Sequence, residues 1–456
     1  MAGHPSNFVE MDEHPFPTQA SAFQLKSMIR FVGKCYARRR QALSCYRAAV
    51  KSRDIDQQRL WASILVSDQD CLIAYTVQAN KALPLSARIP LEDCIEVPLW
   101  MSVKAPLPET VWAWATPKGN GKYRTMAKFG PRQKAMQLIA KDLVATHFVP
   151  RKFQFGHRGV HRAIASFREL TRLAPTHFAH LDIRNFFGSF EREQLKELPV
   201  PQGLVDYVVS GRHLNVKVDT RRSHKKDPKV QTPYPNASMI ITDARSGIPT
   251  GSICSPIVSG WSLSRLRWER DDVALINYAD NFLLLAASAQ KVEAAAEQFV
   301  KAVGNLPGGN FTLALRESGK TGDPFSFLGH QLQIKGGSAS IRPTNETIGA
   351  FKNKFDELEC SLTDLMEVGG KDLEDAKLIL LKMRELIHGW AGAFSECDDI
   401  ELILRESRRA LKFWMQAFDL SERALDDFKK HCGSVVHIDF SGLTIFSDHE
   451  LLELPP

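Results

Sequence analysis

The chain has 456 residues, of which 44% are hydrophobic, and this length and composition suffice for a large core divided into two to four domains. No stretch approaches the roughly eighteen unbroken apolar residues of a membrane span, and no basic and then apolar leader begins the chain, so we expect a cytoplasmic protein without a membrane partner. The net charge of +7 is uneven, because residues 1–394 carry 52 basic and 39 acidic side chains, which suits a polyanionic partner but equally serves solubility.

The first hundred residues predict a helical region. From Ser21 to Ser52, apolar residues recur at intervals of three and four, which indicates an amphipathic helix. Its other face is basic, and contact with nucleic acid and simple solvation are equally good explanations. A second helical pattern runs from Asp56 to Ala82, and several prolines between residues 84 and 108 then predict irregular linkage.

A glycine-rich turn at residues 119–121 is followed by a short predicted strand and by a helix that begins at Pro131. Cationic side chains are dense here: Lys122, Arg124, Lys128, Arg132 and Lys134. Cations on a strand and at a helix start can grip a triphosphate, although isolated lysines and arginines are more often surface charge.

Two apolar runs with single acids, residues 178–183 and 276–285, are the most informative part of the sequence. Asp182 ends the first run, and Asp280 interrupts the second at Ala279-Asp280-Asn281, which predicts a hairpin with the acid presented to solvent at its tip. If the first strand pairs beside this hairpin, the two carboxylates converge and repel each other unless divalent cations lie between them. The alternative is that each aspartate only forms a turn or caps a helix.

The remaining stretches carry weaker signals. Residues 211–235 predict a basic loop, and residues 247–256 predict a turn that leads into a helix, with small residues that would let a backbone pass close to a ligand. A strand is predicted at residues 312–315, with Lys320 in the turn after it. From Asn345 almost to Lys430 the pattern is helical, and a short acidic and apolar tail follows.

Taken in this order, these stretches resemble the reverse transcriptases of the bacterial group II intron and retron lineage, over residues 122–414. The resemblance lies in the cations of the predicted fingers, Leu181-Asp182-Ile183 with Phe187, Gly247-Ile-Pro-Thr-Gly-Ser252, Tyr278-Ala-Asp-Asn281, Lys320-Thr321, Phe327-Leu-Gly329 and Ile387-x-Gly-Trp390. It implies an α+β right-hand polymerase fold with a helical N-terminal extension (1–105), fingers and an antiparallel palm (106–335), a helical thumb (336–432) and an acidic tail (433–456).

The resemblance also implies roles for individual residues. Two Mg²⁺ ions, or Mn²⁺, would be held by Asp182, the Ile183 carbonyl, Asp280 and Asn281, and Lys320 would protonate leaving pyrophosphate. The nucleotide-binding residues would be Lys122, Arg124, Arg132, Phe187 as a steric gate, Thr250, Gly251 and Ser252. The nucleic-acid contacts would be Arg158, Tyr278, Gly329 and Trp390.

Two positions depart from the family pattern. Asn281 stands where the family has a second aspartate, which lowers the negative charge available to a metal, and Thr250 stands where a glutamine is usual. We therefore expect an RNA-directed DNA polymerase that uses dNTPs and an RNA template to make DNA, in antiphage defence with a non-coding RNA. Template-independent or protein-primed synthesis, an inactive RNA-binding scaffold and a group II intron maturase are the alternatives, and an oligomer is compatible with each.

Overall fold

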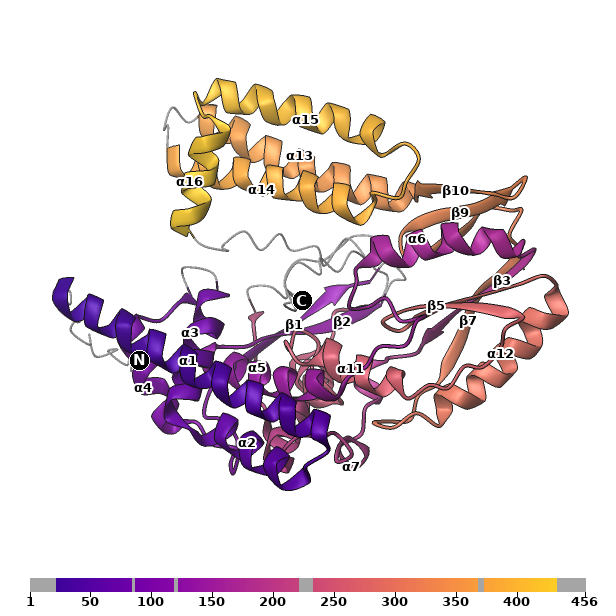
Figure 1. Cartoon of the computed structure of the whole chain (residues 1–456). Coiled ribbons are helices and arrows are strands. Elements are labelled where there is room, and N and C mark those ends of the chain that lie inside the picture. The colour runs from indigo at the N-terminus through magenta and orange to yellow at the C-terminus, as the bar shows by residue number, and fades with distance from the viewer. Residues whose placement is uncertain (1–21, 84–86, 119–121, 221–232, 368–372, 433–456) are drawn as a thin grey trace, which may run out of the picture.

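A computed structural model describes residues 22–83, 87–118, 122–220, 233–367 and 373–432, and shows a mixed α+β chain with largely antiparallel sheets (Figure 1). The predicted acidic tail, 433–456, lies outside the described residues. Within the described ranges, no helix has both the length and the apolar character needed to cross a bilayer.

The N-terminal region is helical, as the sequence predicts. It contains α1 (Ala22–Ser52), α2 (Ile55–Ser67), α3 (Gln69–Lys81), α4 (Leu91–Glu96) and the 3-10 helix η2 (Val97–Trp100). The helical stretch predicted over residues 56–82 is confirmed, and it is divided into two helices at Asp68. The Asp68 carboxylate accepts a hydrogen bond from the Cys71 backbone N–H at 3.0 Å and so caps α3.

A first sheet follows in the order β2 (Tyr123–Lys128), β1 (Thr110–Pro117), β4 (Asn215–Val218), with α10 (Ala237–Arg245) packed against it. Strand β4 runs parallel to β1 in a stretch that the sequence analysis assigned to a loop. Helix α5 (Pro131–His147) begins at the predicted proline, and the half-buried Glu109 carboxylate accepts the backbone N–H groups of Arg132 and Gln133 at its first turn. A Cβ at residue 130 would overlap the Glu109 carboxylate, so a larger residue there would displace this cap from the start of α5.

The central sheet has the strand order β5 (Val273–Tyr278), β6 (Asn281–Ala286), β3 (His177–Ile183), β7 (Leu313–Lys320), and all its pairs are antiparallel. Side chains alternate across this sheet, so that Leu181 and Phe282 join one core and Phe178 and Leu283 join another. Helix α12 (Ala289–Gly304) and α11 (Ser255–Ser264) belong to the first core, and α6 (Val160–Leu170) belongs to the second.

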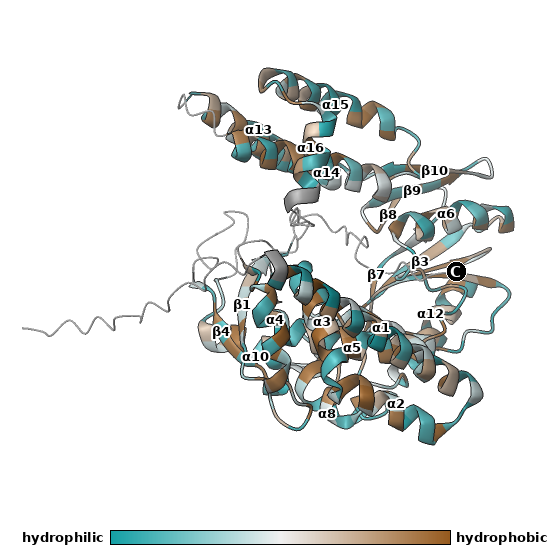
Figure 2. Cartoon of the chain, turned by 60° about the vertical axis from the view of Figure 1, so that its left-hand side comes forward, coloured by the Kyte–Doolittle hydropathy of each residue, from teal (hydrophilic) through white to brown (hydrophobic). Residues whose placement is uncertain are grey.

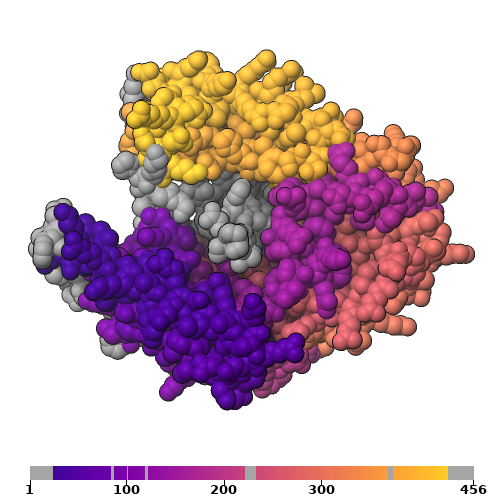
Figure 3. Space-filling model, viewed as in Figure 1, coloured from indigo at the N-terminus to yellow at the C-terminus, as the bar shows by residue number. Residues whose placement is uncertain are grey.

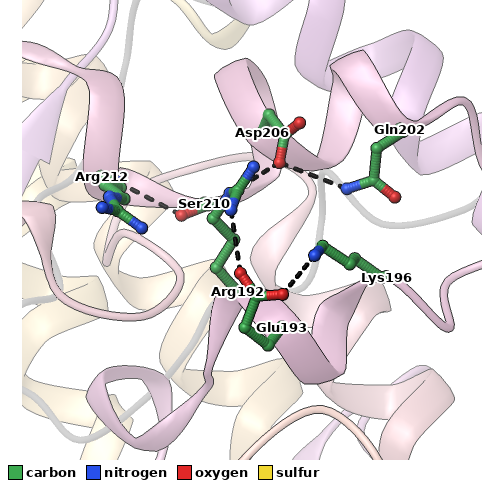
Figure 4. A network of polar contacts seen from close by, with 7 residues as sticks. All are labelled: Arg192, Glu193, Lys196, Gln202, Asp206, Ser210 and Arg212. Atoms are coloured by element: carbon green, nitrogen blue, oxygen red, sulfur yellow. Dashed lines mark hydrogen bonds and ion pairs between the residues drawn. The ribbon is translucent and has the colours of Figure 1, made fainter.

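Short helical turns connect β3 to β4: η4 (Phe187–Ser189), α7 (Arg192–Leu195), α8 (Gln202–Leu204), a π-helical turn η5 (Val205–Val209) and η6 (Gly211–His213); η3 (Thr171–Leu173) precedes β3. Figure 4 shows the polar network that joins α7, α8 and η5. Arg192 donates from Nε to Asp206 Oδ1 at 2.8 Å and pairs with Glu193 at 2.9 Å. The network therefore links α7 to η5, two elements of the segment that follows Asp182 in the chain.

The C-terminal helices stand above the central sheet and are joined to it through a small sheet of β8 (Phe325–Phe327), β9 (His330–Lys335) and β10 (Ser338–Pro343), as Figures 1 and 2 both show. They are α13 (Asn345–Glu367), α14 (Leu373–Ala393), α15 (Ile400–Ala417) and α16 (Glu422–Cys432). Side chains from α13 and α14 share the second core with β6. Figure 3 shows the described residues of these helices and of the N-terminal helices set apart on the front of the molecule, and we call the space between them the hollow.

Candidate active site around Asp182 and Asp280

The predicted hairpin is confirmed. Tyr278 and Asn281 form the last pair of β5 and β6, which leaves Ala279 and Asp280 as a two-residue turn. Ala279 has a φ of +51°, the left-handed conformation that two-residue hairpin turns need. Asp280 therefore lies at the tip of the hairpin.

Strand β3 brings Asp182 to this tip. Asp182 lies opposite Asn281 in the antiparallel pair of β3 and β6, and the Ile183 backbone N–H donates to the Asp280 carbonyl at 3.0 Å. Opposed residues in such a pair have Cα atoms about 5 Å apart. Side chains at 180 and 182 share one face, which is also the face of the second core. The structure thus brings together the two acids that are 98 positions apart in the sequence.

The sequence predicted that the Asp280 carboxyl is presented to solvent. This is wrong, because Asp280 is half-buried. Burial is the main cause that raises its pKa to about 6, and the nearby negative charge of Asp182 adds to the rise. The cations Arg124 and Arg316 act in the opposite direction. Because the charge of Asp182 disfavours ionisation of Asp280, the pair forms a site that gains from an added cation.

Arg316 is a site residue that the sequence reasoning missed. The pairing of β3 with β7 shifts register between His180 and Leu181, so that Arg316 is an extra residue without a partner in the ladder. Such a bulge redirects a side chain. The Arg316 guanidinium donates from Nε to Asp182 Oδ2 at 2.8 Å and makes a second contact with the same oxygen through Nη2. The charge of Asp182 is therefore already paired with a cation of the chain itself, Arg316.

Asn281 is held between two neighbours. His180 Nε2 lies 3.2 Å from Asn281 Oδ1, and Asn281 Nδ2 donates to Asp280 Oδ1 at 3.1 Å. Burial lowers the pKa of His180, which favours a neutral ring whose Nε2–H donates to the amide oxygen. Asn281 therefore orients Asp280 through its amide N–H, and its oxygen, predicted to be a metal ligand, faces His180 instead.

Basic side chains lie beside the two acids. Arg124 on β2 is exposed and close enough to Asp280 to lower its pKa. Lys118, which the sequence analysis overlooked in the turn after β1, has a lowered pKa mainly because of burial and of Arg124, whereas Asp280 and Asp182 raise it. Lys122 is exposed just before β2. Arg132 lies at the first turn of α5, where its charge acts on Glu109.

The small-residue segment at 247–252 packs between these parts. The Ile248 N–H donates to the Phe187 carbonyl, and the Thr250 carbonyl accepts from the Ala127 N–H, both at 2.9 Å. Gly251 is exposed, with a φ of +101°, and a Cβ there would overlap the Ala127 carbonyl oxygen. Phe187 is half-buried at the edge of the first core.

Several predicted contact residues are buried instead. Ser252 and Tyr278 are each 4% exposed, and Trp390 is fully buried, stacked on Phe351 with ring centroids 4.7 Å apart. Gly329 connects β8 to β9, and its carbonyl accepts the Thr344 N–H. Ser252, Tyr278 and Trp390 therefore lie in the interior, and Gly329 is half-buried where the small sheet meets α13. In the sequence, these small and apolar side chains do not distinguish a buried position from a contact with nucleotide or nucleic acid.

Lys320 does not reach the two acids. It ends a β7 that is longer than predicted and lies opposite His177, five residues along β3 from Asp182. At about 3.4 Å per residue, this is roughly 17 Å from Asp182. Arg158, in contrast, is exposed in a segment that runs along β5, since Asn277 exchanges backbone hydrogen bonds with Phe153 and Phe155.

Within the described residues, no group of three His, Cys, Asp or Glu side chains could hold a metal ion. Asp182 and Asp280 alone nevertheless fit a magnesium site of the kind that one or two carboxylates and substrate phosphates complete. No protein-family model matches the sequence, and no curated protein matches it.

Proposed function

We propose that the protein is an RNA-directed DNA polymerase of right-hand architecture, with its active site at Asp182 and Asp280. The observation that carries this proposal is the convergence of the two acids at a two-residue hairpin beside an antiparallel strand. The hollow between the C-terminal and N-terminal helices, visible in Figure 3, would accept the template and product. The resemblance noted in the sequence supports the choice of RNA as template.

The chain's own residues would divide the work as follows. Asp182 and Asp280 would hold Mg²⁺, which when bound supplies charge neutralisation at the triphosphate and activates the attacking hydroxyl. Arg124 and Lys118 would bind the triphosphate and offset the charge that develops on pyrophosphate. Gly251 would let the nucleotide approach the backbone, and Asn281 would keep the Asp280 carboxylate oriented through its 3.1 Å hydrogen bond.

The test measures incorporation of labelled dNTP on an RNA template with a DNA primer, with Mg²⁺ and with Mn²⁺ in separate reactions. Wild type is expected to extend the primer, and Asp182→Asn and Asp280→Asn are expected to fall to background. Asp323→Ala, which removes an exposed acid elsewhere, is the matched control and should retain activity. Product made equally well without RNA would replace this proposal with template-independent synthesis.

A second candidate is a non-catalytic RNA-binding scaffold on the same fold. It is favoured by the Arg316–Asp182 ion pair, because a guanidinium already neutralises one of the two acids, and by the amide at position 281. The same assay separates the two functions. If the wild-type protein incorporates no nucleotide with either metal while it still binds RNA, the scaffold is correct and the polymerase is not.

A further inference from the structure

Helix α1 carries a continuous basic ridge. Its 31 residues include eight lysines and arginines and no acidic residue, and at about 1.5 Å per residue it is about 46 Å long. Six of these cations are exposed and lie on one side of the helix, within about 80° of a common direction at about 100° per residue. We call this set the α1 ridge: Lys26, Arg30, Lys34, Arg40, Arg47 and Lys51.

The opposite side of α1 is committed to the fold. Cys35, Ala42 and Tyr46 are buried and pack toward α2, α3 and α5. The two cations at the flanks of the helix are also used internally: Arg38 pairs with Asp68 at 3.1 Å, and the Arg39 guanidinium lies 4.7 Å from the centre of the Tyr75 ring. These contacts fix the rotation of α1, so that the ridge must point outward.

The ridge cations themselves are free to meet a ligand. None of the six forms an ion pair or hydrogen bond with another residue in the ranges that the structure describes. Figures 1 and 3 show α1 at the front of the molecule, on the outer side of the N-terminal helices. A row of uncompensated positive charge of this length fits a rigid polyanion.

We propose that the α1 ridge is a docking surface for the phosphate backbone of duplex RNA, separate from the hollow that holds the reacting ends. Duplex is favoured over single strand because the exposed residues between the ridge cations, such as Gly33, Ala37 and Ser44, are small and not aromatic, whereas proteins that bind single strands stack bases on aromatic rings. A lipid surface is disfavoured because a membrane-binding amphipathic helix inserts a long apolar face, and from Val32 to Ala49 that face of α1 is buried in the helical bundle. The exposed apolar residues of α1 are confined to its first turns: Leu25, Ile29 and Phe31. The choice of RNA over DNA rests on the proposed function.

The test uses a labelled RNA dumbbell, whose stem of about 20 base pairs is closed by loops at both ends and exceeds the 16 or so base pairs that a double-strand-binding domain covers. A dumbbell has no 3′ end, so it cannot serve as a primer in the hollow. The full-length variant Arg30→Glu/Arg40→Glu/Arg47→Glu is compared with Arg172→Glu/Lys301→Glu/Lys335→Glu, which makes the same change in net charge at exposed positions elsewhere. Circular dichroism establishes that both variants are folded.

In fluorescence anisotropy, the ridge variant should bind the dumbbell at least about 10-fold more weakly than wild type. Its slope of log K against log salt should be shallower by about three, since each lost phosphate contact removes about one. The control variant should stay close to wild type. The proposal would be overturned by equal effects in both variants, by no effect in either, or by tighter binding of a DNA dumbbell. It would also be overturned by ridge-dependent binding of phosphatidylserine vesicles without RNA binding.

Nucleotide incorporation on a short primer and template is measured with the same proteins. The ridge variant should keep wild-type activity there, because the ridge lies outside the proposed active site. Ridge-dependent dumbbell binding by a wild-type protein that incorporates no nucleotide would refute the polymerase and leave the docking surface intact.

Discussion

The contact between Arg316 and Asp182 makes a quantitative prediction about metal binding. A divalent cation that uses Asp182 must displace the Arg316 guanidinium, which donates twice to one carboxylate oxygen. The Arg316 side chain is 50% exposed and that of Asp182 is 13% exposed, so this ion pair is worth about 1–2 kcal/mol after screening by solvent. Arg316→Gln should therefore tighten metal binding by about 5- to 30-fold.

The assay is calorimetric titration of Mn²⁺ into protein that is free of nucleic acid, so that the result does not depend on activity. Arg168→Gln is the matched control, because Arg168 is 41% exposed and pairs with Asp398 at 3.1 Å in another part of the molecule. The control should leave the dissociation constant unchanged. A dissociation constant for Arg316→Gln within twofold of wild type would refute the idea that the guanidinium competes for Asp182.

Three further predictions concern stability. Burial holds the pKa of His330 at about 4, below its ordinary 6.5, so the unfolded chain takes up the proton first and stability is lost as pH falls from 6.5 toward 4. In urea unfolding, the loss of stability between pH 7 and pH 4.5 should be smaller by about 2 kcal/mol in His330→Phe than in wild type, and an unchanged loss would contradict this. Trp390→Ala should cost about 3–5 kcal/mol in the same measurement, with Trp390→Phe much milder, because the indole fills a closed core. Gly251→Ala should cost about 1–3 kcal/mol through its positive φ and its overlap with Ala127, while Gly304→Ala, which meets open space, should melt within a degree or two of wild type.

The sequence predicted the parts of the site that depend on local chemistry. The Ala279-Asp280 turn between two apolar arms specified a hairpin, and period-two alternation is enough to place Asp182 at a strand end. The helix of residues 21–52 was predicted almost to its ends, since its apolar spacing extends over many turns.

Other features depend on contacts between distant segments and could not be predicted. Arg316 reaches Asp182 only because β7 bulges against β3, and register shifts leave no mark in one strand alone. The sequence around Trp390 fits a surface aromatic and a core aromatic equally well, and only the packing of α13 and the small sheet around it shows that it is buried. The division of the helical stretch at Asp68 has no clear sequence signal, because a capping aspartate in a polar stretch resembles an ordinary exposed helical residue.

The shared second core constrains how the molecule can open. Leu283 of the central sheet and Leu386 of α14 belong to one continuous apolar cluster, and the Gly329 carbonyl binds Thr344 and Thr347 at the start of α13. A hinge at this junction would have to separate apolar surfaces and break those hydrogen bonds, and both changes cost free energy. The C-terminal helices should therefore keep a fixed height above the hairpin. The N-terminal helices are anchored on the other side of the sheet in the same way, since Tyr46 and Leu72 share the first core with Leu181, so a change of conformation should stay local to loops and side chains.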